Sequence, residues 1–337
     1  MKRWQFWVGL IVSVVLLGLA LRPLRLEEVW EALRSAHFLW VLPGIAVYFI
    51  GVWARAWRWH YLLRPLARIP VGRMFPIVAI GYMGNNIYPA RAGEVLRAYV
   101  LRRRHQVPMS ASLATIFVER AFDGIVMLGF VFLSLPQLVD LTGQSGFAGN
   151  IRDLALWGAA AFLAATLAFL ALAAFPQRGQ ALAGWFIGRL VPVRARASAY
   201  GIADRFLAGL AALRSPADVF MVFVTSIVIW LLETGKYWLV MQAFPFRVSF
   251  FTLMLMNGIV NLATTLPSAP GYVGTFDAPG IAVLSAYGIR PELAAGYTLL
   301  LHAALWLPIT LLGAYYMTRE SLRWAQVRAE LRQETPT

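Results

Sequence analysis

Long apolar runs separated by short connections follow one another along this chain of 337 residues. A helix needs about 20 apolar residues to cross a hydrocarbon core of about 30 Å. About six runs approach or meet that length, at residues 4–21, 38–59, 109–135, 154–175, 217–241 and 293–317. Two more stretches, 71–105 and 249–289, are interrupted before they reach it. The pattern predicts an all-α polytopic membrane protein with eight apolar segments.

The first interrupted stretch carries Gly84, Asn85, Asn86, Pro89 and Gly93 directly after an apolar run. Two charges, Arg91 and Glu94, then stand where a spanning helix still needs apolar residues. Loosened backbone is tolerated in lipid only where protein buries it or water reaches it. The stretch is therefore either the end of a short helix or, as we expect, a re-entrant helical hairpin that enters and leaves on the cytoplasmic side.

A second copy of this interruption lies 178 residues further along, where Pro-x-x-x-Gly-x-Val at 89–95 aligns with 267–273. The second half begins on the opposite side of the membrane, which predicts two inverted repeats, residues 1–135 and 136–318. The second hairpin, 249–289, then enters from the outer face, and 319–337 form a cytoplasmic tail. Paired broken helices in inverted repeats mark the substrate site of many transporters. Glycine and proline are also frequent in membrane helices, so a chance match stays open.

Charge supports this orientation. The chain is 60% hydrophobic and 14% charged, with a net charge of +14, whereas soluble proteins carry about 25% charged residues. With the N-terminus in the cytoplasm, 22 of the 30 basic residues lie in inner segments, including the far end of the second span with Arg55, Arg58, Arg64, Arg68 and Arg73. This asymmetry is typical of a plasma (cell inner) membrane protein with both termini in the cytoplasm. It explains the basic charge without a nucleic-acid partner.

Two connections differ in character. Residues 22–37 are expected to form a short outer loop. Residues 176–215 hold six arginines and one acidic residue, and we expect an amphipathic helix pair at the cytoplasmic interface with Trp185 and Phe186 as anchors.

A few charges fall inside the expected spans: Glu119, Arg120 and Asp123 in the third, and Glu233 and Lys236 in the fifth. A charge at a helix centre costs about 2.5–3.5 kcal/mol on insertion scales, so such residues are functional candidates by default. Glu233 and Lys236 are spaced for a structural ion pair.

Arginine suits bidentate phosphate contacts, and Arg91, Arg97 and Arg120 are therefore candidates to hold a phosphate. Glu94, Glu119 and Asp123 are candidate counter-ions or proton carriers. Purely structural pairing of these groups remains the alternative. The second hairpin has Ser268, Tyr272, Thr275 and Asp277 in place of this pattern, so an anion is expected to prefer the first.

The sequence lacks the motifs of several classes of enzyme. There is no cysteine, no phosphate-binding loop and no Gly-x-Ser-x-Gly nucleophile elbow. The four histidines are scattered singly, and His60 and His302 have no suggestive neighbours in the sequence. We expect no cofactor and no metal.

Asn86 to Glu94, Arg97, Glu119-Arg120 with Asp123, and Pro270 to Gly274 together resemble the lysylphosphatidylglycerol synthase transmembrane-region family. The resemblance covers about residues 5–320. Similarity to the multiple peptide resistance factor implies a flippase-like membrane domain that moves aminoacylated phosphatidylglycerol between leaflets. The full-length synthases carry a soluble aminoacyltransferase domain after this region. The chain ends at Thr337, so lipid synthesis is not implied.

The leading hypothesis is a lipid translocase for a membrane phospholipid or a polyprenyl-phosphate lipid. A membrane-embedded transferase with Glu94 or Asp123 as base is the alternative, as is a non-catalytic partner of a separately encoded synthase. A homo-oligomer stays open. Labelling is expected to reach residue 90 from inside and residue 268 from outside. The substrate-binding candidates are Asn85, Asn86, Arg91, Glu94, Arg97, Glu119, Arg120, Asp123, Pro270, Gly271, Tyr272 and Asp277.

Overall fold

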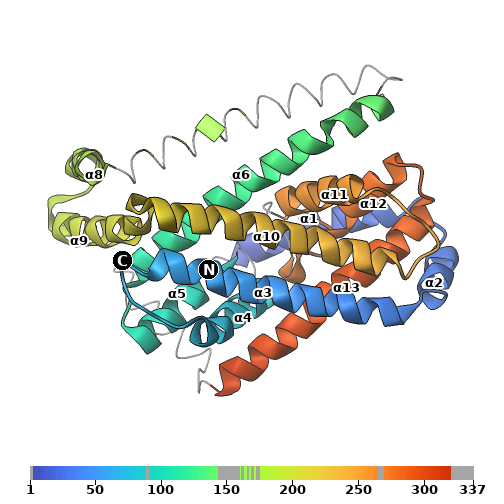
Figure 1. Cartoon of the computed structure of the whole chain (residues 1–337), viewed down its shortest axis with the longest axis horizontal. Coiled ribbons are helices and arrows are strands. Elements are labelled where there is room, and N and C mark those ends of the chain that lie inside the picture. Colours follow the sequence, from blue (N-terminus) through green and yellow to red (C-terminus); the bar gives the residue numbers. More distant parts are fainter. Residues whose placement is uncertain are drawn as a thin grey trace.

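A computed structural model describes residues 3–88, 91–142, 175–264 and 269–319, together with residues 160, 163, 164, 167 and 171. Within these residues all regular structure is helical (Figure 1). The α-helices are α1 (Arg3–Leu21), α2 (Leu26–Arg34), α3 (Val41–Leu63), α4 (Val71–Ile87), α5 (Ala92–His105), α6 (Met109–Thr142), α8 (Pro176–Leu190), α9 (Val193–Gly209), α10 (Pro216–Met241), α11 (Phe250–Ala263), α12 (Asp277–Ala286) and α13 (Pro291–Arg319). Short 3-10 turns cover Phe38–Trp40, Ala211–Arg214 and Pro270–Tyr272.

Three of the described helices are long and apolar enough to cross a membrane: Phe38–Leu63, Pro216–Met241 and Pro291–Arg319. They correspond to the second, fifth and last expected spans. The first and third expected spans form α1 and α6, and α6 carries four charged residues within its length. The fourth expected span, 154–175, and the tail, 319–337, lie almost wholly outside the described residues.

Helices α3 and α10 pack against each other in opposite directions at the centre of the molecule (Figure 1). Near the start of α3, the His37 amide donates to the Ala243 carbonyl over 2.9 Å. At its far end, Arg64 Nη1 lies 3.0 Å from Asp218 Oδ1 near the start of α10. Gly44 allows close contact between the helices, because a Cβ there would meet Val240 Cγ2 at 2.9 Å.

The first interrupted stretch forms two helices, α4 and α5, that pack against each other as a hairpin. Three glycines let the helices touch. A Cβ on Gly84 would lie 2.7 Å from the Cα of Gly93, and one on Gly93 would collide with the carbonyl oxygen of Gly81. The helix α4 ends before Pro89, which disfavours helical geometry in the residue before it; Pro89 and Ala90 themselves lie outside the described residues.

The second interrupted stretch forms α11, a 3-10 turn and α12. Gly271 and Gly274 adopt left-handed φ angles of 77° and 80°, which glycine takes at little cost. Ser13 of α1 supports the turn, because its hydroxyl accepts from the Ala269 amide over 2.7 Å. Residues 265–268, including the expected tip at Ser268, lie outside the described residues.

The two hairpins interlock the halves of the chain. The helix α4 packs against α13, and α11 packs against α6. Gly313 makes the first contact possible, because a Cβ at this position would meet Ala79 O at 2.6 Å. Each hairpin is thus held by a long helix from the other half of the chain.

The connections differ in one respect from the expectation. Residues 22–37 are not a loop throughout, because Leu26–Arg34 form the helix α2, which packs against α13 and buries Val29. The apolar residues Leu26, Val29, Trp30 and Leu33 recur at helical spacing, a signal that the charges around them obscured. In 176–215 the expected helix pair is present as α8 and α9, with Trp185 and Phe186 exposed.

We predict that Gly93→Ala disrupts the α4–α5 hairpin. Overpacking a close contact costs about 1–3 kcal/mol, and the colliding atoms here belong to rigid helical backbone. The variant is expected to lower the melting temperature measured by circular dichroism in detergent. Gly72→Ala, on the same hairpin but with open space around its Cβ position, is the matched control and is expected to melt at or above the wild-type temperature. Equal melting temperatures for both variants would contradict the close-packed hairpin.

Candidate functional site

A charged cavity lies between the two hairpins, with about 1120 Å³ of empty space including its open mouth. Five cationic and three acidic side chains line it, a formal excess of +2. The charged and titratable lining residues are Arg55, Arg91, Arg97, Arg120, Lys236, Glu94, Asp123, Glu233, Tyr48, Tyr82, Tyr237, Tyr272 and His302. An excess of positive charge surrounded by apolar helices favours an anionic ligand.

The accessible part of the cavity wall is formed by Arg91, Glu94 and Arg120, whose side chains are 31%, 27% and 40% exposed. One carboxylate oxygen, Glu94 Oε1, lies 3.9 Å from Arg91 Nη1 and 3.9 Å from Arg120 Nε. Arg91 adopts a left-handed φ of 52° at the position that caps α5. Such strain in a non-glycine residue persists only where the surroundings hold it, and it clusters at functional sites.

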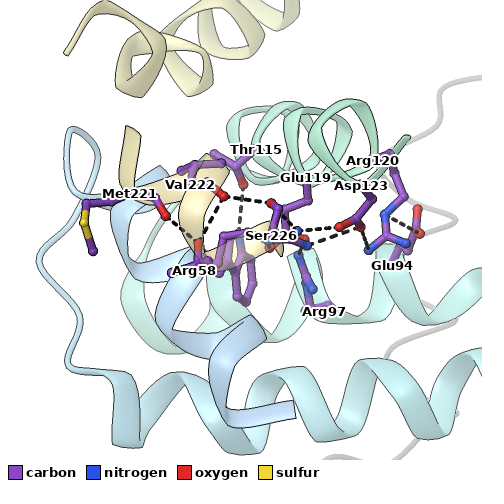
Figure 2. Close-up of polar contacts among 12 residues, drawn as sticks. Arg58, Glu94, Arg97, Thr115, Glu119, Arg120, Asp123, Met221, Val222 and Ser226 are labelled. Carbon is purple, nitrogen blue, oxygen red and sulfur yellow. Dashed lines mark hydrogen bonds and ion pairs between the residues drawn. The ribbon is translucent and has the colours of Figure 1, made fainter. Parts of the chain in front are cut away.

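Beneath this wall lies a buried charge cluster (Figure 2). Arg58 of α3 is fully buried and contacts both carboxylate oxygens of Asp123 on α6, at 2.5 and 3.3 Å. Arg58 also donates to the Ser226 hydroxyl of α10 over 2.9 Å. Asp123 further accepts from the Trp230 indole and pairs with Arg120 Nη2 at 3.3 Å. Asp123 thereby links the buried cluster to the accessible wall.

Arg97 of α5 is turned toward the interior of the bundle rather than held by Glu94. It forms an ion pair and hydrogen bond with Glu119 of α6, and its guanidinium lies 3.9 Å from the ring centroid of Trp59. Trp59 in turn donates to the Thr115 hydroxyl over 2.9 Å. Arg97 still lines the cavity, but its charge is balanced inside the protein.

A second charge cluster joins α3 and α10. Arg55 Nη1 lies 2.8 Å from Glu233 Oε1, and Lys236 forms an ion pair with the same carboxylate. The ammonium of Lys236 lies 4.4 Å from the ring centroid of Tyr48. The expected pairing of Glu233 with Lys236 is confirmed.

By sequence, Arg55 and Arg58 count with the basic residues at the cytoplasmic end of the second span, with no acidic partner. Both are buried inside the bundle and paired with acids on other helices. A signal for this was present, because the 178-residue shift places Arg55 on Glu233 and Arg58 on Lys236. No acidic residue lies near either arginine in the sequence, so local charge counting missed the partners.

Several guanidinium donors in and beneath the cavity have no acceptor within the described residues. These are the Nε groups of Arg55, Arg58, Arg97 and Arg120. An unsatisfied buried donor costs about 1–3 kcal/mol, so such atoms need an explanation in a native fold. Of these arginines, Arg120 is the most exposed to the cavity.

The second hairpin forms the opposite wall. Gly271 and Tyr272 line the cavity, as does Asn86 from the first hairpin, whose amide donates to Thr310 over 2.8 Å. Pro270 is adjacent but does not line it, and Asp277 contacts the lining residue His302. His302, without suggestive neighbours in the sequence, hydrogen-bonds to both Asp277 and Gly271.

The structure thus brings most of the sequence candidates together. Nine of the twelve line the cavity, and Glu119, Pro270 and Asp277 lie next to lining residues. The sequence missed an aromatic and basic part of the lining that comes from α3, α4, α10 and α13: Tyr48, Arg55, Tyr82, Trp230, His302 and Trp306. Lys236, named from the sequence as the partner of Glu233, lines the cavity with them.

Comparison with known families gives a match over residues 6–313 to the lysylphosphatidylglycerol synthase TM region. The chain belongs to this family. It is similar to proteins named UPF0104 membrane protein from Methanothermobacter thermautotrophicus, 25% identical over 86% of this chain and 88% of that one, and MJ1595 from Methanocaldococcus jannaschii, 21% identical over 90% and 91%. It is also 27% identical to a Haloferax volcanii protein named Glycosyltransferase AglD. That match covers 90% of this chain but only 52% of the Haloferax protein.

Membership in this membrane protein family changes how the buried charges are understood. Ionisable side chains on helices inside a bilayer face the bundle interior or a wet cavity, and they pair with one another. Glu94 of the accessible wall and the buried acids Glu119, Asp123 and Glu233 each have an arginine or lysine within 4.0 Å. The acidic side chains inside this membrane protein are therefore paired with basic ones, as the low polarity of a bilayer requires.

We predict that Arg58→Gln strongly destabilises the protein. Removing one partner of a buried ion pair costs about 3–5 kcal/mol, because Asp123 would keep its charge without this partner. Arg64→Gln, at the residue that caps the C-terminus of the same helix, is the matched control. Its ion pair with Asp218 is half exposed, so its loss is expected to cost no more than about 1 kcal/mol. Denaturation in mixed micelles measures both, and equal losses would contradict the structural role of Arg58.

Proposed function

We propose that this protein is a flippase-like translocase that moves an anionic lipid, a phospholipid or a polyprenyl phosphate, between membrane leaflets. The observation that carries the proposal is the accessible cavity wall, where Arg91 and Arg120 both lie 3.9 Å from one carboxylate oxygen of Glu94, with Arg120 also paired with Asp123. The phosphate of a lipid headgroup would bind between these two arginines. Its acyl or prenyl chains would remain among the apolar helices.

The chemistry of the wall suits a phosphate. Both contacts to Glu94 are 3.9 Å long, beyond normal hydrogen-bond distance, so a phosphate oxygen can replace the carboxylate as the closer partner. The buried Nε of Arg120 has no hydrogen-bond acceptor among the described residues. Arg91 also lies at the N-terminus of α5, where the helix dipole favours an anion.

The arrangement of helices supports an inverted-repeat transporter. The 178-residue shift aligns α3 with α10, α4 with α11 and α6 with α13, and α3 and α10 run antiparallel. Arg55 and Glu233, which are equivalent under this shift, contact each other. A residue that touches its own equivalent lies close to a two-fold axis. In this proposal the hairpins α4–α5 and α11–α12 are re-entrant from opposite faces.

In this arrangement the chain is a multi-pass protein of the plasma membrane with both termini in the cytoplasm. The cavity lies where the two hairpins meet, as in transporters whose broken helices form the substrate site near the midplane. The sequence carries no phosphate-binding loop for ATP. The energy for net movement would then come from the lipid gradient or from an ion gradient.

A membrane-embedded transferase is the second candidate, favoured by the name of the Haloferax relative. Both oxygens of Asp123 are occupied by Arg58, Arg120 and Trp230, which leaves Glu94 as the more available base. Incubation of the purified protein with a labelled lipid phosphate and a sugar donor separates the two candidates. A new covalent product without leaflet movement would favour the transferase.

We predict that Arg91→Ala with Arg120→Ala abolishes leaflet exchange of a fluorescent phosphatidylglycerol in reconstituted vesicles. A hydrogen bond to a charged group contributes about 1.5–3 kcal/mol, so each arginine is worth about tenfold or more. Arg68→Ala, an exposed arginine away from the cavity, is the matched control and is expected to retain the wild-type rate. A double variant that folds and exchanges lipid at the wild-type rate would refute the site.

Single cysteines test the orientation of the hairpins, because the chain contains no other cysteine. Ile87→Cys near the first tip and Val273→Cys near the second replace residues that are each 40% exposed. An impermeant maleimide is expected to label the first from the cytoplasmic side and the second from the outer side. Labelling of both from one side would rule out inverted hairpins.

A further inference from the structure

His302 has an acceptor on each side of its ring. Its Nδ1 lies 2.8 Å from Asp277 Oδ1, and its Nε2 lies 2.7 Å from the carbonyl oxygen of Gly271. The other Asp277 oxygen accepts from the Gly274 amide over 2.9 Å. The ring therefore lies between the start of α12 and the left-handed turn of the second hairpin, and it contacts both.

This geometry determines how many protons the imidazole ring of His302 carries. A neutral imidazole carries one N–H donor and one lone pair, so at one of its two contacts a lone pair would face an acceptor at hydrogen-bond distance. With Asp277 ionised, both contacts are satisfied only when both ring nitrogens donate. The carboxylate of Asp277, which already accepts from a backbone amide, is then the counter-ion of an imidazolium.

The geometry points to His302 and Asp277 as a proton-binding site that couples lipid movement to a proton gradient, an inference that rests on the proposed translocase function. Asp277 is 1% exposed, whereas the His302 side chain is 14% exposed and lines the cavity. A proton can therefore pass between the ring and the cavity, while the carboxylate stays buried. No covalent step is involved; one N–H bond forms or breaks.

Proton release has a structural consequence. The neutral ring can donate to Asp277 or to Gly271, but not to both. One contact between α13 and the second hairpin is then lost, next to Tyr272 on the cavity wall. With the proton bound, His302 of α13 donates hydrogen bonds to both Asp277 and Gly271 of the second hairpin. Without the proton, only one of these two hydrogen bonds remains. Binding of the proton thus favours the conformation in which the turn of the second hairpin is hydrogen-bonded to α13. This turn forms one side of the lipid site.

The surroundings assign this role to His302 rather than to another group. The titratable and charged groups facing the cavity from the neighbouring elements are Tyr272, Tyr82, Tyr48, Tyr237, Arg55, Glu233 and Lys236. Arg55 and Lys236 are paired with Glu233. Arg91, Arg97, Arg120, Glu94 and Asp123 belong to the opposite wall and pair with carboxylates or arginines there or beneath it. Among the described residues Asp277 is the acid in ion-pair contact with the His302 ring.

The first test detects the proton without any transport assay. Nitrogen-15 solid-state NMR of histidine-labelled protein at neutral pH resolves four histidines at most, and His302→Gln assigns the signal of interest. Both ring nitrogens of His302 are expected to carry protons. A neutral ring would overturn the assignment of an imidazolium at His302, whatever the protein transports.

The second test measures coupling. Vesicles containing the protein and fluorescent phosphatidylglycerol receive a gradient of one pH unit, with the membrane potential held at zero. If one proton moves per lipid, the steady-state ratio of reporter between leaflets is expected to shift by up to about tenfold, because one unit of pH corresponds to a factor of ten in proton activity. A protonophore is expected to return the ratio to one. An unshifted ratio in a wild-type protein that exchanges lipid would overturn the coupling.

Variants separate the two proposals. His302→Gln and Asp277→Asn are each expected to remove the response to the gradient, and His37→Gln, at an exposed histidine outside the cavity, is expected to keep it. A full response in His302→Gln would also refute the coupling. If the wild type exchanges no lipid at all, the translocase proposal fails and the coupling fails with it. The NMR result then still decides whether the proton site exists.

Discussion

The buried contact between Arg58 and Asp123 is the interaction on which the rest of the structure depends. It joins α3 to α6 and, through Ser226 and Trp230, both helices to α10. Burying an unpaired charge is far costlier than burying a hydrogen-bonded pair, so these three helices can pack only in the arrangement that brings the partners together. The cavity above them follows from that arrangement.

The hairpins depend on a different constraint, the absence of side chains at their closest contacts. Gly84 and Gly93 let α4 and α5 touch backbone to backbone, and Gly271 allows the turn against Trp306. Close contact brings the first turn of α5, with Arg91 and Glu94, to the cavity wall. The same glycines that interrupt the apolar pattern thus place the charges that a lipid phosphate would meet.

The two walls of the cavity have different chemistry on related helices. The wall formed by the first hairpin and α6 presents Arg91 and Arg120 beside Glu94. The wall formed by the second hairpin and α13 presents Tyr272 and His302, and His302 pairs with the buried Asp277. The division fits a transporter in which one wall binds the anion and the other responds to a proton. Both proposals depend on the same cavity, but each has its own decisive residues.

Much of the fold was predictable from apolar periodicity alone. The helices α4 and α5 lie within 71–105, α11 and α12 within 249–289, and α8 and α9 within 176–215. The sequence predicted interrupted or paired helices in these three ranges, because run length and glycine or proline positions are local properties. The candidates Arg91, Glu94 and Arg120 were predictable for a related reason: a charge in an apolar segment is conspicuous without knowledge of its partner.

The partners were decided by the tertiary structure. Arg55 and Arg58 belong by sequence to a basic flank, yet their acids lie on α10 and α6, more than 60 residues away. Arg97 forms an ion pair with Glu119. His302 hydrogen-bonds to Asp277 and Gly271 only when α13 packs on the second hairpin. The sequence by itself determined which segments are helical and where charge enters the apolar core. Only the packing of distant helices decided which charges neutralise each other and which remain available to a ligand, because pairing energy depends on distance in space.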